Sequence, residues 1–399
     1  MQYKDKFDLI LGRSKSLFQD DIDRNYEHIK STIGKARVLV VGAAGSIGQA
    51  VASEIFKLQP ICLHCVDTSE NNLVELTRII RSEYAQKNID YMSVPIAIGS
   101  IEFDAFINSQ PAYTHVFNLS ALKHVRTEKD AYGLMRMIDV NIIQSLSLAR
   151  YCGDVNAKYF CVSTDKAASP ANAMGATKRA MELFLTAEAT KTKTSLARFA
   201  NVAFSDGSLL HGFTMRLSKH QPITAPQDVK RYFISPKEAA QLCTMSSVFG
   251  DSGDIFFPSP NVNLPLISFE DIALKFIEYS GYKVKKCNDE DEARHAIDKK
   301  CYENGEWPCY FFKSDTTGEK PYEEFFTENE ELDLLSFNTL GIVKNFEKPN
   351  VTLLNEFEVK IMQLRENGRW TREELISLIK DLVVTFNHIE TGRYLDSRM

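Results

Sequence analysis

Short apolar segments alternate with longer amphipathic ones over the first half of the chain. "ARVLVVG", "ICLHCVD", "THVFNLSA" and "KYFCVSTD" each resemble a buried strand, and helical patterns separate them. Strands that alternate with helices form a parallel sheet with helices on both faces. The pattern therefore predicts an α/β protein with a Rossmann-like doubly wound parallel sheet over residues 36–205. "GDIFFPSP" predicts a returning strand near 253–260.

The rest of the chain divides around this core. We expect an N-terminal helical segment over 1–35, a smaller C-terminal substrate domain over 206–345 and a helical tail over 346–399. The charge-dense segment 284–310 favours a surface helix. In the tail, the capping box "TREE" opens one apolar stripe that consists of Leu375, Leu378, Ile379, Leu382, Val383 and Phe386. This stripe packs on its own domain or contacts a second subunit, and the pattern leaves both open.

Composition removes several classes of function. A net charge of -6 gives no reason to expect a nucleic-acid partner. Because the chain has no signal-peptide apolar region and no 18-residue apolar stretch, we expect a cytoplasmic protein without a membrane partner. Cys62 and Cys65 form a CxxC inside an apolar strand, but a zinc site would need a second ligand pair. We therefore expect buried strand cysteines and no metal site.

A glycine turn lies between the first strand and the helix after it. The GxxGxxG spacing lets backbone N–H groups approach a pyrophosphate at a helix N-terminus. We therefore expect a dinucleotide to be held by Gly42, Gly45, Ser46, Ile47 and Gly48.

Asp67 follows the second strand, about 20 residues after the glycine turn. Its carboxylate can accept hydrogen bonds from both ribose hydroxyls and would repel a 2′-phosphate, which favours NAD over NADP. Arg78 or Arg81 could instead neutralise a phosphate, so NADP stays an alternative. Asp67 could also serve as the N-cap of the helix that follows.

Seven segments of the chain carry a family resemblance, in the family's order, over about residues 36 to 330. They are "VGAAGSIGQ", "LSALKHV", "DVNIIQS", "VSTDKAASPANAMGATKR", "ARFANVAFSDGSLLHGF", "KRYFISPKEAAQL" and "TTGEKPYEEF". The chain resembles an extended short-chain dehydrogenase/reductase of the polysaccharide-biosynthesis type, namely the UDP-N-acetylglucosamine 4,6-dehydratases. Such enzymes usually carry Tyr-x-x-x-Lys, whereas this chain has Met174 and Lys178. Met at this position resembles the subgroup that retains configuration at C5.

The resemblance implies roles for the residues around the missing Tyr. Thr164 matches the residue that hydrogen-bonds the C4 oxygen, Asp165 the general acid, and Lys166 the base at C5. Because neighbouring residues at a strand end point to different sides, Asp165 and Lys166 should flank the C5–C6 bond. Lys178 should hold the nicotinamide ribose, and Met174 should form an apolar wall. Asp165 and Lys166 would then carry out the proton transfers that the Tyr usually performs.

The resemblance also implies binding residues and two departures. Further cofactor contacts are expected from Ser100, Ser120, Ala121, Lys123 and Asn141. UDP contacts are expected from Lys123, His124, Asn201, Lys230 and Arg231. Ser100 stands where the family usually has an acidic residue, and Thr316 stands where many members have Arg. The membrane-spanning N-terminal half of some relatives has no counterpart here, so we expect a soluble form.

The expected reaction is dehydration of UDP-N-acetylglucosamine, which gives the 4-keto-6-deoxy sugar with C5 retained, for surface-glycan synthesis in bacteria. NAD would be tightly bound and recycled, because the hydride leaves and returns within one turnover. We also expect a homo-oligomer. Three alternatives stay open: hydride return to C4 to give a 5,6-ene, a UDP-sugar C4 epimerase, and a non-catalytic dinucleotide-binding scaffold.

Overall fold

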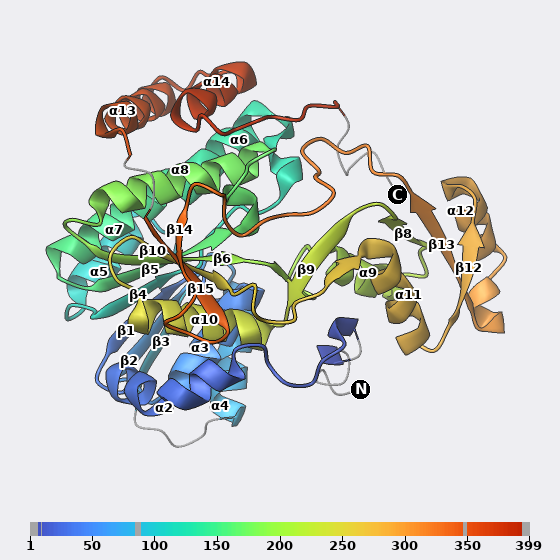
Figure 1. Ribbon diagram of the computed structural model, residues 1–399, viewed down its shortest axis with the longest axis horizontal. Coiled ribbons are helices and arrows are strands. Elements are labelled where there is room, and N and C mark those ends of the chain that lie inside the picture. The colour runs from blue at the N-terminus through green and yellow to red at the C-terminus, as the bar shows by residue number, and fades with distance from the viewer. Residues whose placement is uncertain (1–6, 9, 84–88, 346–348, 393–399) are drawn as a thin grey trace.

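The computed structural model describes residues 7–8, 10–83, 89–345 and 349–392. Its centre is a nine-stranded sheet in the order β14-β15-β10-β6-β5-β4-β1-β2-β3 (Figure 1). Neighbouring strands from β3 through to β10 are parallel, and β15 and β14 extend the sheet with antiparallel pairing. The strands of this sheet are β1 (Arg37–Val41), β2 (Cys62–Val66), β3 (Asp90–Val94), β4 (His115–Asn118), β5 (Lys158–Thr164), β6 (Lys193–Phe199), β10 (Asp254–Pro258), β14 (Glu331–Asp333) and β15 (Leu340–Asn345).

Helices cover both faces of the sheet, as the alternating pattern predicts. Helices α2, α3 and α10 pack together on one face, and α6, α7 and α8 pack on the other (Figure 1). The helices connected with the sheet are α2 (Gln19–Ile33), α3 (Ser46–Lys57), α4 (Glu70–Glu83), α5 (Ile101–Ser109), α6 (Ala131–Ile138), α7 (Gln144–Asp154), α8 (Ala173–Glu188) and α10 (Pro236–Phe249). The fold is therefore the doubly wound Rossmann-like class.

Residues 206–345 contribute to three sheets. Strand β10 lies within the predicted range 253–260 and pairs with β6, and its three central residues, Ile255, Phe256 and Phe257, are fully buried. Two small sheets have the orders β11-β9-β7 and β12-β13-β8. Their strands and helices are β7 (Asn201–Val202), β8 (Ile223–Pro226), β9 (Lys230–Ile234), β11 (Leu266–Ser268), β12 (Lys283–Cys287), β13 (Glu306–Phe312), α9 (Leu209–Ser218), α11 (Phe269–Tyr279) and α12 (Glu290–Asp298).

The charged segment 284–310 does not form a single surface helix. It contains most of β12, then α12, and then the start of β13. The prediction was wrong because charge density hides the apolar positions that decide the structure. Trp307 and Cys309 in β13 are fully buried, in the same apolar cluster as Ile223 and Ala225 of β8.

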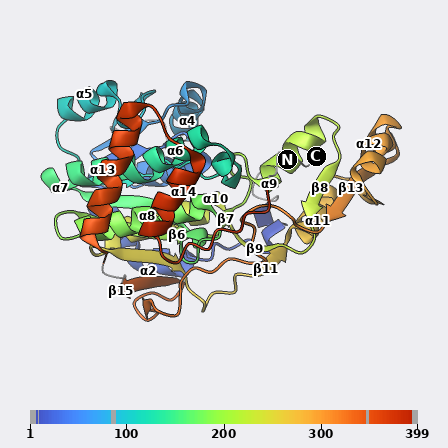
Figure 2. The ribbon, with the colours of Figure 1, turned by 90° about the horizontal axis from the view of Figure 1, so that it is seen from above.

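The C-terminal helices α13 (Val351–Asn367) and α14 (Arg372–Leu382) lie across α6 and α8 (Figure 2). The predicted stripe faces inward: Leu375, Ile379 and Val383 are buried with Leu183 and Phe184 of α8. Of the two interpretations that the pattern leaves open, the stripe packs on its own chain.

A buried ion network joins the sheet to the segment after β13. Arg198 on β6 is fully buried, and its guanidinium donates to both Glu182 on α8 and Glu330, at 2.8–2.9 Å. It also donates to the carbonyl of Phe325 at 2.8 Å. Ser163, near the end of β5, donates to the same Glu182 at 2.6 Å. Each buried charge therefore has an opposite partner, as burial in low dielectric requires.

Candidate active site

The predicted glycine turn connects β1 with α3. Gly42 has a φ of +76°, and a Cβ there would lie 2.6 Å from the backbone nitrogen of Ser120. A Cβ at Gly48 would collide with the carbonyl oxygen of Gly42. Gly45 is the N-cap of α3, so the turn leads directly into the helix end that attracts anions. Glycine at these positions therefore allows the close backbone contacts of the turn.

Asp67 lies just after β2 and bridges two backbone segments. Its Oδ2 accepts a hydrogen bond from the backbone of Ala44 at 2.9 Å, and its Oδ1 accepts from the backbone of Ser69 at 2.9 Å. The second bond holds the turn that leads into α4. The carboxylate also lines a cavity with the glycine turn. Asp67 is not the N-cap of α4, which begins at Glu70, because its side chain bonds the backbone of Ser69 before the helix. A contact with the cofactor ribose stays a prediction.

This cavity lies at the carboxyl ends of β1, β2 and β4 and has a volume of about 270 Å³. Its lining residues are Val41, Gly42, Gly45, Asp67, Thr68, Ile96, Ala97, Ile98, Leu119, Ser120, Ala121, Leu122, Arg136 and Val140. The structure thus brings together five of the predicted cofactor residues: Gly42, Gly45, Asp67, Ser120 and Ala121. Ligands of open α/β sheets bind at this edge.

Two other predicted cofactor residues have structural partners. The hydroxyl of Ser100 accepts from the backbone of Phe103 and caps α5. The amide of Asn141 donates to the carbonyl of Leu122 and to Thr177 on α8, and accepts from the backbone of Leu122. Neither residue lines the cavity. Asn141 lies in a π-helical turn, and its bonds hold the loop after β4 against α8.

Lys123 and His124 lie beside a loop that reaches the glycine turn. The backbone of Asp206 in this loop donates to the hydroxyl of Ser46 at 2.9 Å. A Cβ at Gly207 would collide with the His124 ring, so the ring packs on the loop. Burial lowers the pKa of Lys123, although the negative charge of Asp206 opposes this shift. Burial also lowers the pKa of His124, and the positive charge of Lys123 lowers it further.

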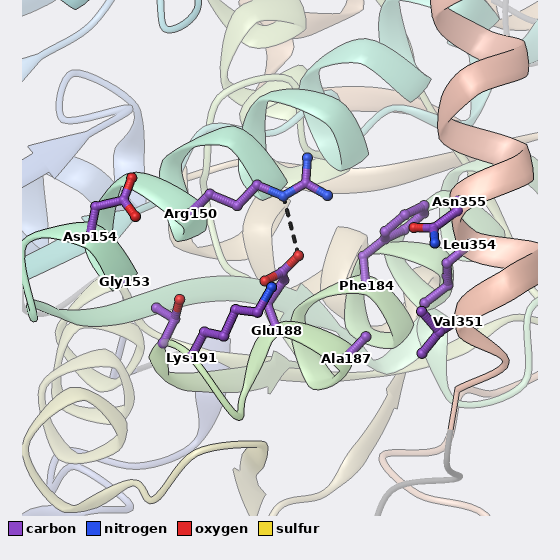
Figure 3. Close-up of a pocket in the computed structure, with 11 residues that line it drawn as sticks. Arg150, Gly153, Asp154, Phe184, Ala187, Glu188, Lys191, Val351, Leu354 and Asn355 are labelled. Carbon is purple, nitrogen blue, oxygen red and sulfur yellow. Dashed lines mark hydrogen bonds and ion pairs between the residues drawn. The ribbon is translucent and has the colours of Figure 1, made fainter.

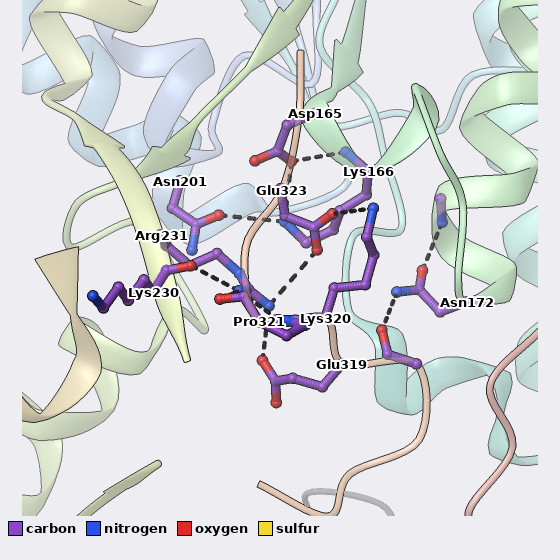
Figure 4. A network of polar contacts seen from close by, with 12 residues as sticks. Asp165, Lys166, Asn172, Asn201, Lys230, Arg231, Glu319, Lys320, Pro321 and Glu323 are labelled. Atoms are coloured by element: carbon purple, nitrogen blue, oxygen red, sulfur yellow. Dashed lines mark hydrogen bonds and ion pairs between the residues drawn. The ribbon is translucent and has the colours of Figure 1, made fainter. Parts of the chain in front are cut away.

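The predicted proton-transfer residues form one compact turn at the end of β5. Oδ1 of Asp165 accepts from the Thr164 hydroxyl at 2.9 Å. It also accepts from the Lys166 backbone at 2.8 Å and the Lys166 ammonium at 3.0 Å (Figure 4). Oδ2 of Asp165 is buried and has no hydrogen-bond partner within the described ranges. Lys166 also donates to Asn201 at 3.4 Å.

The side chains of Asp165 and Lys166 therefore converge, whereas strand alternation predicts that they point to different sides. The alternation does not hold because Asp165–Ala167 form a 3₁₀ turn. That the pair flanks the C5–C6 bond of the sugar stays a prediction.

Helix α8 holds the Met-for-Tyr position against this turn. Met174 and Lys178 are both buried, one helical turn apart. The Lys178 ammonium donates to the carbonyl of Val162 at 2.9 Å, and burial lowers its pKa. A Cβ at Gly175 would lie 2.5 Å from the carbonyl oxygen of Lys166. The glycine thus lets the helix approach the turn closely.

Sequence reasoning missed three charged residues on the opposite side of the site. Glu319, Lys320 and Glu323 surround the buried guanidinium of Arg231 (Figure 4). Arg231 pairs with Glu319 at 2.9 Å and Glu323 at 3.6 Å, and it donates to the carbonyl of Lys320 at 2.9 Å. Burial raises the pKa of Glu319 and of Glu323, and the Lys166 charge opposes both shifts. The available signal was the group of three carboxylates, Glu319, Glu323 and Glu324, in "GEKPYEE".

Not all predicted UDP contacts come together. Both terminal nitrogens of Arg231 have partners within the chain, whereas Lys230 is exposed and points away from the cluster (Figure 4). Asn201 does reach Lys166. Thr316 lies in the loop just before this cluster, and its carbonyl accepts from the backbone of Glu319 at 3.3 Å.

The end of the described chain forms a strap between the two sides of the site. We define the strap as residues 386–391. The backbone amides of Asn387 and Ile389 donate to the carbonyls of Pro170 and Ala171, each at 3.1 Å. The backbone amide of Gly318 donates to the carbonyl of Ile389 at 2.8 Å. His388 anchors the strap on the buried Glu128 at 3.1 Å. Glu128 also accepts from the backbone of Ala173, the first residue of α8.

A larger cavity of about 780 Å³ lies between α7, the end of α8 and α13 (Figure 3). Arg150 in its wall pairs with Glu188 at 3.2 Å and, outside the lining, with Glu358 at 2.7 Å. None of the predicted site residues line this cavity. We therefore take the smaller cavity, next to the glycine turn, as the candidate cofactor site.

The fold and the glycine turn together define the class of this protein as a doubly wound Rossmann-like α/β protein with a glycine turn of the dinucleotide-binding type. A family model described as "Polysaccharide biosynthesis protein" matches residues 38–345, and the chain belongs to that family. In the part of the chain that is described, no helix has the length and apolar character needed to span a membrane.

Curated relatives carry several names. An uncharacterized membrane protein of Methanocaldococcus jannaschii is 27% identical, over 90% of this chain and 99% of its own. The capsular polysaccharide biosynthesis protein CapD of Staphylococcus aureus is 26% identical over 79% of this chain, which spans about half of CapD (49%). A UDP-glucose 4-epimerase of Rickettsia bellii is 25% identical, over 85% of this chain and 97% of its own.

Two solved structures share the fold. Pen from Bacillus thuringiensis has a TM-score of 0.62 at 22% identity, covering 78% of this chain and 88% of its own. The dTDP-glucose 4,6-dehydratase DesIV from Streptomyces venezuelae, with NAD bound, has a TM-score of 0.55 at 13% identity, covering 72% and 88%.

The strap should depend on the contact between His388 and Glu128. His388→Ala removes a hydrogen bond to a buried carboxylate, a loss of about 1.5–3 kcal/mol. We expect hydrogen exchange at the amides of Gly318 and Ile389 to become at least about 10-fold faster. Val384→Ala, at a tail residue that is 79% exposed, is the matched control and should leave both amides unchanged. Unchanged exchange in His388→Ala would mean that the backbone bonds alone hold the strap.

Proposed function

We propose that this chain is an NAD-dependent nucleotide-sugar enzyme. Its specific reaction would be the dehydration of UDP-N-acetylglucosamine to the 4-keto-6-deoxy sugar, with C5 configuration retained, in the synthesis of bacterial surface glycans. The observation that carries the proposal is the pair Asp165 and Lys166, 3.0 Å apart, with one buried oxygen of Asp165 left for another donor. Elimination needs an acid and a base side by side.

The residues around the smaller cavity fit NAD. Gly42 and Gly48 leave no room for a Cβ, and a helix N-terminus faces the turn. Each oxygen of Asp67 accepts one backbone bond, so a second lone pair stays available for ribose hydroxyls. Its negative charge disfavours a 2′-phosphate. When bound, NAD supplies the hydride acceptor for C4 and returns the hydride later in the cycle. We propose that it stays bound throughout.

Thr164 and Asp165 can take the proton that a Tyr would otherwise accept. Oxidation at C4 releases the proton of the 4-hydroxyl. The Thr164 hydroxyl can receive this proton while it donates its own to Asp165, 2.9 Å away. Asp165 then holds a proton near the 6-hydroxyl, with little exposure to water. The apolar side chain of Met174 excludes water without any proton chemistry of its own.

Elimination then uses both members of the pair. Lys166 in its neutral form removes the C5 proton, and Asp165 gives its proton to the departing hydroxyl, which leaves as water. The pair ends as carboxylate and ammonium, the ion pair seen in the structure. Lys166 afterwards returns its proton to C5 as C6 becomes a methyl group. The proton that Asp165 gives to the departing hydroxyl is the one that came from the 4-hydroxyl, so Asp165 and Lys166 end the cycle as carboxylate and neutral amine, the states in which they began it.

The UDP contacts belong to the same proposal. Lys123, His124, Asn201, Lys230 and Arg231 would hold the nucleotide. A direct diphosphate contact by Arg231 requires its guanidinium to exchange at least one internal partner. Lys230, which is exposed, can reach a diphosphate without such an exchange. We assign to Arg231 the further task of holding Glu319 and Glu323 against the sugar site.

A C4 epimerase is the second candidate, because the Rickettsia bellii relative carries that name. Epimerisation needs reversible hydride transfer at C4 and makes no use of an acid–base pair for elimination. Return of the hydride to C4 after elimination, which gives a 5,6-ene, and a non-catalytic scaffold are the other outcomes that the experiments below distinguish.

Substitutions in the pair test the proton roles. Asp165→Asn and Lys166→Ala should each lower the rate of dehydration at least about 10²-fold, the lower end for a lost general acid or base. Lys166→Arg is the matched variant: it keeps the positive charge and cannot act as a base, so it should be as slow as Lys166→Ala. The product rate is followed by NMR. A fast Lys166→Arg variant would show that only the charge is needed.

The purified chain should carry NAD. The cofactor has no reason to leave during a cycle that restores it, so heat-treated protein should release NAD into the supernatant. Chromatography with NAD and NADP standards checks this. Asp67→Ala should reduce the amount bound, because the ribose loses its acceptor. Recovery of NADP alone would contradict the proposed role of Asp67.

A reaction in D₂O tests the product. Lys166, deuterated by exchange with solvent, should place deuterium at C5 beside a C6 methyl group. NMR of the UDP-sugar product should show that methyl signal with retained C5 configuration. A vinyl pair of C6 protons without a methyl signal would establish the 5,6-ene, a change confined to the C4 hydroxyl would establish an epimerase, and recovery of unchanged sugar would favour the scaffold.

A further inference from the structure

The CxxC motif does not act as a pair. Cys62 and Cys65 are three residues apart on β2, so their side chains point to opposite faces of the sheet. Cys62 shares its face with His64, two residues on, and with Asp90, its neighbour in register on β3. The sulfur, an imidazole nitrogen and a carboxylate oxygen of these three residues lie within 4.8 Å of one another.

The imidazole of His64 is oriented for a ligand. Its Nδ1 lies 2.7 Å from the hydroxyl of Tyr113, and the ring stands edge-on to the Tyr113 ring. If Nδ1 donates its hydrogen to that hydroxyl, the lone pair of Nε2 is free. This Nε2 is fully buried, has no hydrogen-bond partner in the described part of the chain, and lies 3.4 Å from a carboxylate oxygen of Asp90. A hydrogen bond on the second ring nitrogen is the usual support of a metal-bound histidine.

A second buried nitrogen on the same face also lacks a partner. Arg37 on β1 is in register with Cys62, and its Nε has no hydrogen-bond partner among the described residues. Two buried nitrogens without partners on one face of the sheet require an explanation. A thiolate at Cys62 would give Arg37 an acceptor, while a cation would occupy the lone pair of His64. Binding of one cation would therefore give the Nε of Arg37 an acceptor and occupy the lone pair of the His64 Nε2.

We propose that Cys62, His64 and Asp90 form a zinc site at the amino-terminal edge of the sheet. Thiolate, imidazole and carboxylate are the ligands that Zn²⁺ takes in proteins, and water would complete the tetrahedron. Asp90 is 55% exposed, so the ion can enter from solvent. On binding, the thiol of Cys62 releases one proton to water and the sulfur–zinc bond forms; neither partner is oxidised or reduced.

The site lies away from the proposed chemistry. The cofactor cavity is at the carboxyl end of β2, next to Asp67, whereas Cys62 is the first residue of that strand. A bound ion would join β2 to β3, which is the edge strand of the large sheet. Its role would be to hold that edge, and the proposal does not depend on which sugar reaction the enzyme performs.

Metal content of the purified, untagged full chain tests the proposal. After chelation and dialysis against Zn²⁺, we expect one zinc per chain in the wild type and in Cys65→Ser, the matched control on the opposite face of the same strand. Cys62→Ser and Asp90→Asn should lose the ion. Tyr113→Phe should weaken binding by about 10-fold, the lower end for a lost partner of a metal ligand. Substitution with Co²⁺ should give a thiolate-to-metal absorption band only where Cys62 is present.

The opposite results are equally clear. Zinc retained in both Cys62→Ser and Asp90→Asn would place the ion elsewhere, and a wild type without stoichiometric zinc would refute the site. Asp90 is at an exposed edge, so Asp90→Asn should keep the fold, and circular dichroism with bound-NAD content checks each variant. Loss of zinc without loss of NAD separates this inference from the proposed function.

Discussion

The buried guanidinium of Arg198 is the interaction on which the rest of the structure depends. It is fully desolvated, and it is stable there because Glu182 and Glu330 surround it with opposite charge. Breaking one such pair leaves a buried charge without compensation, which costs about 3–5 kcal/mol. Glu182 lies on α8 and Glu330 lies in the segment after β13. Arg198 on β6 therefore holds both of these elements, which flank the site, in place.

The site is assembled on this frame from loops that are far apart in sequence. The turn after β5 carries Asp165 and Lys166, and Gly175 lets α8 press against that turn. The loop that carries Glu319 and Glu323 is held from one side by Arg231 and from the other by the strap. The C-terminal helices are therefore more than a cover for apolar surface, because the chain that leaves them binds both loops.

In the mechanism that we propose, the absence of the Tyr changes the route of proton transfer. In this site Thr164, Asp165 and Lys166 are joined by hydrogen bonds of 2.9 and 3.0 Å. A proton can move along them while water is largely excluded, because Asp165 and Met174 are both buried. Proton transfer along a preformed chain needs position rather than a particular side chain, so a Met at the Tyr position is compatible with catalysis.

The sequence by itself determined the fold class, the glycine turn, the strand near 253–260 and the existence of the apolar stripe of α14, because the period of apolar residues and the conformation of glycine are local properties. It also indicated Thr164, Asp165 and Lys166 as neighbours. Only the tertiary structure decided that the α14 stripe packs on its own chain, that Asp165 and Lys166 converge, that Arg231 pairs with Glu319 and Glu323, and that Cys62 faces His64 and Asp90. Such contacts join residues on different elements, and their geometry depends on how those elements pack, which no local pattern records.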